Sequence, residues 1–414
     1  MIVELKKEIE SKFGKTVKNR GDCEMIANSI MLTLNIEISY NTIRRLYELA
    51  PYTKPNSKTL NTLAQFVGYK DYFHFTQNHR FQEKTKLFQI TYKLIHDENE
   101  FEILELVKKT NRSSEGFVDF ITLLVRELFY KKYYSLINEI FYLKEMYYSN
   151  FSYSELLSFG NSIGLLLRKQ NRVPKKLTEN NNFLNCIYLT FVDYSCLNSY
   201  YGSWANSLRL TKTDDDIALF SYAVLQFKKF LNQTAVKQVD AELVYSKNRH
   251  PILCSRLLAL QLLSKNKFNV ADILPKYYKV HSKSNYSTDY SYELYTTSIL
   301  TKNIEVMRFL IEKSDLSIEF LYQRHHLNSF YLMSAFYHKL INNKVEARHV
   351  FQRFSMNECH YSYEEYIHLF YLIYLFHESR VLSEKNQITI RYNSLSKKLN
   401  YPYFSEGLML NYFM

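Results

Sequence analysis

The 414-residue sequence contains little glycine and little proline, with 8 Gly and 6 Pro. Average usage is roughly 7% and 5%, and tight hairpin turns depend on these residues. Their scarcity argues against a protein built from many short strands. Together with the helical periodicity seen through most of the chain, it predicts an all-α fold.

Cysteine is also scarce, and no two cysteines have CxxC spacing; they are Cys23, Cys186, Cys196, Cys254 and Cys359. This pattern indicates neither zinc nor disulfides. The first residues, MIVELKKEIESKF, lack the apolar core of a signal peptide, and the longest apolar run, Leu369 to Phe376, is far shorter than a membrane span. We therefore expect a cytoplasmic protein with no membrane contact, metal or cofactor.

Enzyme signatures are missing as well: there is no Gly-rich phosphate loop, HExxH, GxSxG or paired Cys/His set. We expect no catalytic activity. One alternative rests on Arg353 and His360, which six residues separate, a spacing similar to the motif of the helical HEPN-type ribonucleases.

Two further groups of polar residues are open to a metal interpretation. Asp214 to Asp216 would need additional oxygen ligands, so they are expected to cap a helix N-terminus, where negative charge suits the helix dipole. His325 and His326 are expected to form a surface or helix-end pair instead of a ligand set.

The net charge of +12 favours an anionic partner. Residues 1–80 hold 12 Lys and Arg against 8 Asp and Glu, a net charge of +4, which leaves +8 for the other 334 residues. The N-terminal segment is thus the more basic part per residue. Nucleic acid is the expected anion, and a generally basic, solvated surface is the alternative.

The first 70 residues are predicted to form four short, capped helices. Their expected ranges are Ile2–Phe13, followed by Gly14; a helix capped by Asp22 and ending at Leu34; Tyr40–Leu49, capped by Ser39; and Lys58–Val67, capped by Ser57 and closed by Gly68. Val3 and Ile9 are expected on the inner side of the first helix, and Met25, Ile26 and Ile30 on that of the second.

The order and sequence of these helices resemble the helix-turn-helix family of the phage Cro and C1 repressors. Ile26-Ala27 matches the family's buried Leu-Ala pair, SYNTIRRLYE (39–48) its recognition helix, and PNSKTLNTLAQFVG (55–68) its Pro-Ser-x-x-Thr-Leu segment. The connection from Met31 to Ile38 is longer than the family's turn. Similar variants occur at the N-termini of Bacteroidetes proteins. The resemblance covers about 60 residues and implies a DNA-binding domain over residues 1–80.

The third helix is predicted to carry the base-reading residues. If Ile43, Leu46 and Tyr47 face the core, the opposite side presents a hydrogen-bonding surface. That surface would consist of Tyr40, Asn41, Arg44, Arg45 and Glu48.

Arginine can bond guanine O6/N7 and asparagine adenine N6/N7, each contact giving roughly 1–3 kcal/mol of discrimination. Asn41 and Arg44 are therefore the expected primary base readers, while Tyr40 and Arg45 could reach a base edge or a phosphate. The alternative is that both arginines only solvate the helix and pair with Glu48.

Phosphate contacts are expected near helix starts, where backbone N–H groups and the helix dipole favour anions. The candidates around the fourth helix are Lys54, Ser57, Lys58 and Thr59. Those before the second helix are Lys15, Lys18 and Arg20.

Residues 81–414 are predicted to form an antiparallel helical-repeat domain, with a possible division at 170–182. Polar breaks at 96–99, 110–113 and 265–267 separate the helical stretches. The segment 330–354 resembles one tetratricopeptide unit, in which small Ala335 and Ala347 let two helices approach closely. Segments 292–311 and 257–278 repeat this pattern.

The expected function is sequence-specific binding of double-stranded DNA by a transcriptional regulator. This layout is similar to peptide-responsive regulators, which implies a homodimer whose repeat domain binds a peptide or protein. One alternative is a helical-repeat interaction scaffold, for example in phage defence, whose N-terminal domain binds protein. A ribonuclease using Arg353 and His360 is the minor alternative.

Overall fold

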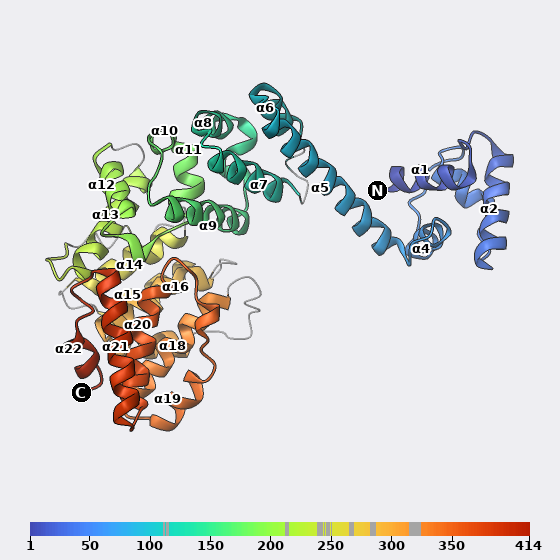
Figure 1. Cartoon of the computed structure of the whole chain (residues 1–414). Coiled ribbons are helices and arrows are strands. Elements are labelled where there is room, and N and C mark those ends of the chain that lie inside the picture. Colours follow the sequence, from blue (N-terminus) through green and yellow to red (C-terminus); the bar gives the residue numbers. More distant parts are fainter. Residues whose placement is uncertain are drawn as a thin grey trace. The chain divides into compact units, whose positions relative to one another are not determined.

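The computed structural model describes residues 1–110, 112, 116–211, 215–237, 243, 245, 249, 251–264, 269–281, 287–313 and 324–414. Within these ranges every regular element is helical and none is a strand (Figure 1), which confirms the predicted all-α class. None of the helices in these ranges combines the length and hydropathy that a membrane span requires.

The chain divides into two compact units. Unit 1 comprises Met1–Ile103 and Ser113–Leu123, and unit 2 comprises Leu104–Arg112 and Leu124–Met414. The helices of the first 130 residues are α1 (Ile2–Phe13), α2 (Arg20–Leu34), α3 (Tyr40–Leu46), α4 (Ser57–Phe66), α5 (Tyr72–His96), α6 (Glu100–Lys109) and α7 (Phe117–Tyr130). The division between the units therefore falls within α6 and α7.

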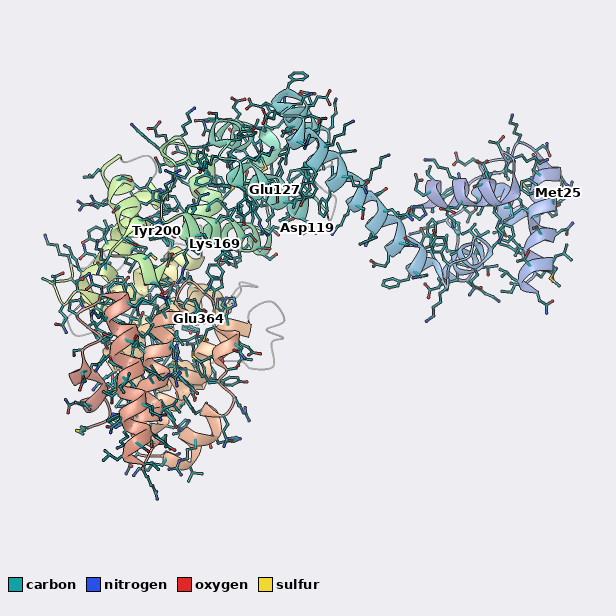
Figure 2. The ribbon with its side chains drawn as sticks, viewed as in Figure 1. Met25, Asp119, Glu127, Lys169, Tyr200 and Glu364 are labelled. Atoms are coloured by element: carbon teal, nitrogen blue, oxygen red, sulfur yellow. The ribbon has the colours of Figure 1, made fainter. Side chains whose placement is uncertain are left out.

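Apolar side chains from α1 to α5 meet in one core in unit 1. Its buried members are Leu5, Ile9, Cys23, Ile26, Ile30, Ile43, Leu46, Leu63, Ala64, Phe66 and Phe75. In α2 these residues follow helical spacing, which leaves Met25 on the outer side (Figure 2). Val3 of α1 is outside the core for the same reason. The predictions that Val3 and Met25 face inward were wrong, and both are more than half exposed.

Unit 2 continues as a succession of helices. They are α8 (Tyr134–Tyr142), η1 (Lys144–Met146), η2 (Tyr148–Asn150), α9 (Tyr153–Gln170), α10 (Lys175–Thr178), α11 (Asn181–Phe183), the π-helical η3 (Leu184–Tyr188), η4 (Tyr194–Cys196), α12 (Tyr200–Thr211), α13 (Asp215–Leu231), α14 (Pro251–Leu263), α15 (Val270–His281), α16 (Ser287–Thr301), α17 (Ile304–Lys313), α18 (Arg324–Leu340), α19 (Lys344–Phe351), η6 (Met356–Glu358), α20 (Glu364–Glu378), α21 (Leu382–Leu399) and α22 (Glu406–Asn411). Contacts run mainly between helices close in sequence, such as α12 with α13 and α18 with α19.

Several predicted features of unit 2 can be located. The segment 330–354 forms the helices α18 and α19, and Ala335 and Ala347 are buried as predicted. The polar segment 170–182 contains α10 and α11, and it buries Leu177 and Asn180. Asp214, half of the break at 110–113 and the break at 265–267 lie outside the described residues.

Two glycines one turn apart in α9 allow the following segment to approach the helix closely. A Cβ atom at Gly160 would lie 1.8 Å from Thr190 Oγ1, and one at Gly164 would lie 2.2 Å from Cγ of the Phe191 ring. Only hydrogen fits at these positions, so the glycines fix how α9 packs against residues 186–191.

We predict that Gly164→Ala destabilises unit 2 by about 1–3 kcal/mol, because the added methyl group must displace the buried Phe191 ring. Gly407→Ala in α22 is the control, since its Cβ would have no neighbour nearer than 3.8 Å. Urea unfolding followed by the fluorescence of Trp204, the single tryptophan and a buried residue of unit 2, measures both. Equal stability of the two variants would contradict the prediction.

Three histidine rings lie close together in unit 2. His325 and His326 are in the first turn of α18, and His325 is 4.3 Å from His326 and 5.3 Å from His360 between ring centroids. The pair is at a helix end, as expected, but it is not on the surface, because His326 is only 6% exposed. Desolvation lowers the pKa of His325 to about 2 and the pKa values of His326 and His360 to about 3.

The remaining residue of the ribonuclease alternative, Arg353, is exposed in the turn after α19. η6 separates it from His360, so the two residues do not share one helix. No group of three His, Cys, Asp or Glu side chains is placed to hold a metal ion in the part of the chain that the structure describes.

The buried histidines make stability depend on pH. They stay neutral in the folded protein, whereas the unfolded chain takes up protons near the ordinary pKa of 6.5. The unfolding free energy should therefore fall as pH decreases from about 6.5 towards 3. Thermal melting followed by Trp204 fluorescence between pH 7.5 and 4.5 measures this slope.

His325→Phe should make that slope shallower, because it keeps a ring in place but removes one titrating group. His349→Phe is the matched control, since the His349 side chain is 57% exposed. The interpretation fails if both variants keep the slope of the unsubstituted protein.

Candidate nucleic-acid interface

The start of α2 is built by a reciprocal cap. The Asn19 side chain accepts from the Asp22 N–H (3.0 Å), and Asp22 Oδ2 accepts from the Asn19 N–H (3.2 Å). This capping box places the helix start at Arg20, so the prediction that Asp22 is the N-cap was wrong. Asn19, three residues before Asp22, was the sequence signal for it.

The connection between α2 and α3 is short. α2 ends at Leu34, Asn35 follows in the left-handed region with φ 55°, and Ser39 caps α3 by accepting from the Asn41 N–H (3.3 Å). Only residues 35–39 lie between the helices. The bounds Met31 to Ile38 expected for this connection were therefore wrong, because α2 continues to Leu34, which is also where the sequence predicted it to end.

α3 ends earlier than predicted. Its last residue is Leu46 and not Leu49. Glu48 adopts a left-handed backbone with φ 61°, and the Leu49 N–H donates to Arg44 O (2.9 Å), which ends the helix. Ile43 and Leu46 are fully buried, and the Tyr47 hydroxyl donates to Lys6 O (3.0 Å). The prediction that this side of α3 faces the core is confirmed.

The two expected base readers contact each other. Arg44 Nη1 donates to Asn41 Oδ1 (3.1 Å), and Arg44 Nη2 lies 3.4 Å from Leu49 O. Both side chains are half-buried. These bonds hold the guanidinium in one orientation, while the Asn41 amide NH₂ and the other guanidinium N–H groups are not engaged in them.

Tyr40 and Arg20 are also brought together. The Arg20 guanidinium lies over the Tyr40 ring, 4.9 Å from its centroid, and its Nε donates to Glu24 (2.7 Å). The hydrogen bond to Glu24 raises the pKa of Arg20. Arg20, expected to contact phosphate, thus lies beside Tyr40, expected to contact a base or a phosphate. They are the first residues of α2 and α3.

The Arg45 side chain is exposed, and no ion pair involves it among the described residues. Glu48 pairs instead with Lys6 of α1 (2.8 Å), whose hydrogen bond lowers the pKa of the Glu48 carboxyl. The alternative pairing of Arg44 or Arg45 with Glu48 is therefore not present.

Two of the expected phosphate contacts lie before α2, in different surroundings. The Lys15 ammonium pairs with the buried Asp22 carboxylate (2.6 Å) and, with the Lys18 backbone N–H, lowers the pKa of Asp22. Asp22 is thus held by the cap and by Lys15 together. The Lys18 side chain is exposed.

The start of α4 differs by one residue from the prediction. The N-cap is Asn56, whose side chain accepts from the Thr59 N–H (2.8 Å), so the expected cap at Ser57 was wrong. Lys54, Ser57 and Lys58 are exposed there, and the first-turn N–H groups of Ser57 and Lys58 have no partner within the helix. From the sequence alone, either Asn56 or Ser57 could be the N-cap, because both residue types are common at this position.

We predict that Asn56→Ala destabilises unit 1 by about 1 kcal/mol, because the Thr59 N–H loses its acceptor. Ser57→Ala, one residue further along, should change stability much less. Hydrogen exchange of the α4 amides compares the two variants, and faster exchange is expected only in Asn56→Ala. Faster exchange in Ser57→Ala than in Asn56→Ala would instead identify Ser57 as the N-cap.

No protein-family model, curated protein or solved structure matches this chain.

Proposed function

We propose that unit 1 is a helix-turn-helix DNA-binding domain and that the chain is a transcriptional regulator. The observation that carries the proposal is the division of α3 into two faces. Ile43 and Leu46 lie in the core, whereas the linked pair Asn41 and Arg44 is half-buried beside the exposed Arg45. A short helix with a buried back and an amide–guanidinium front has the chemistry needed to read adenine and guanine edges.

In this proposal Asn41 and Arg44 contact bases, and Tyr40 and Arg45 contact a base edge or the backbone. Lys18, Lys54 and Lys58 would bind phosphates, as would the N–H groups and side chains at the start of α4. Arg44 already has a fixed orientation through Asn41 and Leu49 O, which reduces the entropy lost on binding.

The proposal extends to the whole chain. A twofold dimer would place two copies of α3 in successive major grooves, about 34 Å apart. The helices of unit 2 would form a tetratricopeptide-like repeat domain that dimerises or binds a peptide or protein. The hairpin of α18 and α19, with its buried Ala335 and Ala347, supports this part.

A second candidate is that unit 1 binds protein in an interaction scaffold. Apolar side chains on the outside of α2 favour it, since Met25, Met31 and Leu32 are 55%, 44% and 88% exposed. Solvent-exposed apolar residues on one helix are typical of contact surfaces for protein.

The test for DNA binding uses the full chain and a randomised duplex pool. Bound DNA is sequenced, and the affinity for the enriched site is measured for the unsubstituted protein and for Asn41→Ala with Arg44→Ala. Loss of both contacts should cost about 2–6 kcal/mol on that site and leave non-specific binding nearly unchanged. Affinity should also fall steeply between about 50 and 200 mM salt.

The control is Gln82→Ala with Lys86→Ala, which removes an amide and a cation from α5 of the same unit and should not change the enriched sequence. Enrichment that survives loss of Asn41 and Arg44 would contradict base reading by α3. An absence of enrichment would favour the protein-binding candidate.

A further inference from the structure

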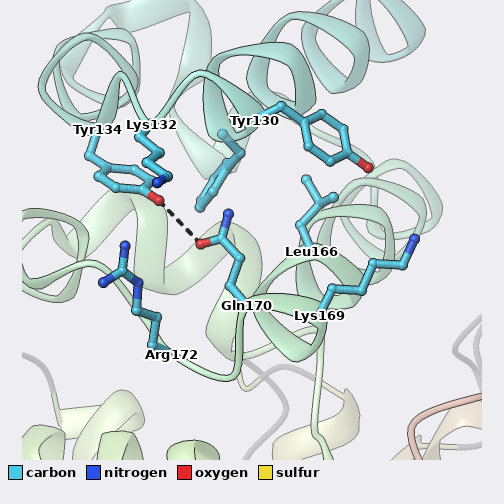
Figure 3. A pocket seen from close by; sticks show the side chains of 8 residues that line it. Tyr130, Lys132, Tyr134, Leu166, Lys169, Gln170 and Arg172 are labelled. Atoms are coloured by element: carbon cyan, nitrogen blue, oxygen red, sulfur yellow. Dashed lines mark hydrogen bonds between the residues drawn. The ribbon is translucent and has the colours of Figure 1, made fainter.

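A pocket of about 320 Å³ opens in unit 2 where α7 and α9 end (Figure 3). Its lining residues are Phe129, Tyr130, Lys132, Tyr134, Leu166, Lys169, Gln170 and Arg172. The volume is at the lower end of the range for small-molecule sites. None of these residues belongs to the candidate DNA interface, so this site is independent of it.

The polar groups around the pocket are almost all hydrogen-bond donors. Three cations line it, Lys132, Lys169 and Arg172, and no acidic residue does. The Tyr134 hydroxyl donates to Gln170 Oε1 (3.2 Å), which occupies the acceptor of that amide and leaves its NH₂ group on the pocket side (Figure 3). Lys132 and Arg172 lie beside this hydrogen bond, while Lys169 extends on the opposite side.

The three cations have no carboxylate partner among the described residues, although many other lysines and arginines of the chain do. Lys132 and Arg172 lie on one side of the pocket and Lys169 on the other, so three exposed cations surround it and no carboxylate in the described part of the chain neutralises them. Like charges in one site repel unless an anion joins them, so an anionic ligand would find favourable potential there.

Compensation of the helix dipoles is the ordinary explanation for cations at helix C-termini. Here four of the carbonyls at the ends of α7 and α9 already accept from the backbone. The N–H groups of Lys131, Lys132 and Tyr133 donate to Glu127, Phe129 and Leu128 O, and the Asn171 N–H donates to Arg168 O. The lysine and arginine heads are thus not needed to satisfy those carbonyls.

We propose that this pocket binds a small organic anion, a carboxylate or a phosphate attached to an apolar body. Lys132, Arg172 and the Gln170 NH₂ bind the anionic group, and Lys169 adds positive potential from the other side. Phe129, which packs edge-on against Tyr134 at 5.7 Å between ring centroids, and the buried Leu166 provide the apolar wall for the body of the ligand.

The experiment is isothermal titration calorimetry of the full chain, without DNA, using two anionic probes. Phenyl phosphate represents the phosphate source, and N-acetylphenylalanine represents a free carboxylate such as a peptide C-terminus. N-acetylphenylalanine amide is the uncharged match. One or both anions should bind with one-to-one stoichiometry, and the amide should bind at least about tenfold more weakly because it lacks the charge-assisted hydrogen bonds.

The test variant is Lys132→Asn with Arg172→Gln, which should weaken anion binding at least about tenfold. Asparagine is chosen because Lys132 has φ 63°, a left-handed backbone that Asn tolerates. The matched control, Lys175→Gln with Lys176→Gln, removes the same charge from neighbouring α10 outside the lining. Gln170→Leu keeps all three cations and should also weaken anion binding. It tests the same site independently if the double variant does not fold.

Three results would overturn the proposal. The first is that neither anion binds at millimolar concentration, and the second is that the uncharged amide binds as tightly as the anions. The third is that the control variant, Lys175→Gln with Lys176→Gln, loses as much anion affinity as the test variant, which would show that only net charge matters. DNA binding by unit 1 does not enter any of these outcomes.

Discussion

The candidate interface depends on the burial of one side of a very short helix. α3 has seven residues, too few to be stable in isolation, so its tertiary contacts must maintain it. Ile43 and Leu46 provide them by packing into the core of unit 1 without exposed surface, or nearly so. The helical period then determines where the neighbouring side chains lie: Arg45 is exposed, and Asn41 and Arg44 are half-buried at the edges of the buried side.

Polar contacts at the ends of the helices complete this arrangement. Asn19 and Asp22 fix where α2 begins, and the left-handed Glu48 fixes where α3 stops. The Lys6 ammonium bonds Glu48, and the Lys6 carbonyl accepts from Tyr47, so α1 is attached to the end of α3 twice. A change in either helix end would rotate or lengthen α3 and move the outward residues with it.

The sequence alone was sufficient for the helical class, the range of α1 and the buried side of α3, because each follows from residue spacing. It failed at helix boundaries, where Asn19 and Asn56 cap the helices in place of the expected Asp22 and Ser57, and where each of these residue types can act as an N-cap. It also missed the pocket of unit 2. The signals FYKKYY and LRKQNR are ordinary helix-end sequences, and they form a site only because α7 and α9 end beside it.

The lysines and arginines of unit 1 have different surroundings in the structure, which their number in the sequence does not show. Lys15 is bound to the Asp22 carboxylate of the capping box, so transferring it to a phosphate would remove the only side-chain cation paired with Asp22 among the described residues. Arg20 and Glu24 form an exposed pair that solvent screens, so Arg20 could exchange partners at little cost. Lys18, Lys54 and Lys58 lie exposed and need no such exchange. The number of phosphates that unit 1 can neutralise is therefore smaller than its count of lysines and arginines, and Arg20, not Lys15, belongs in that number.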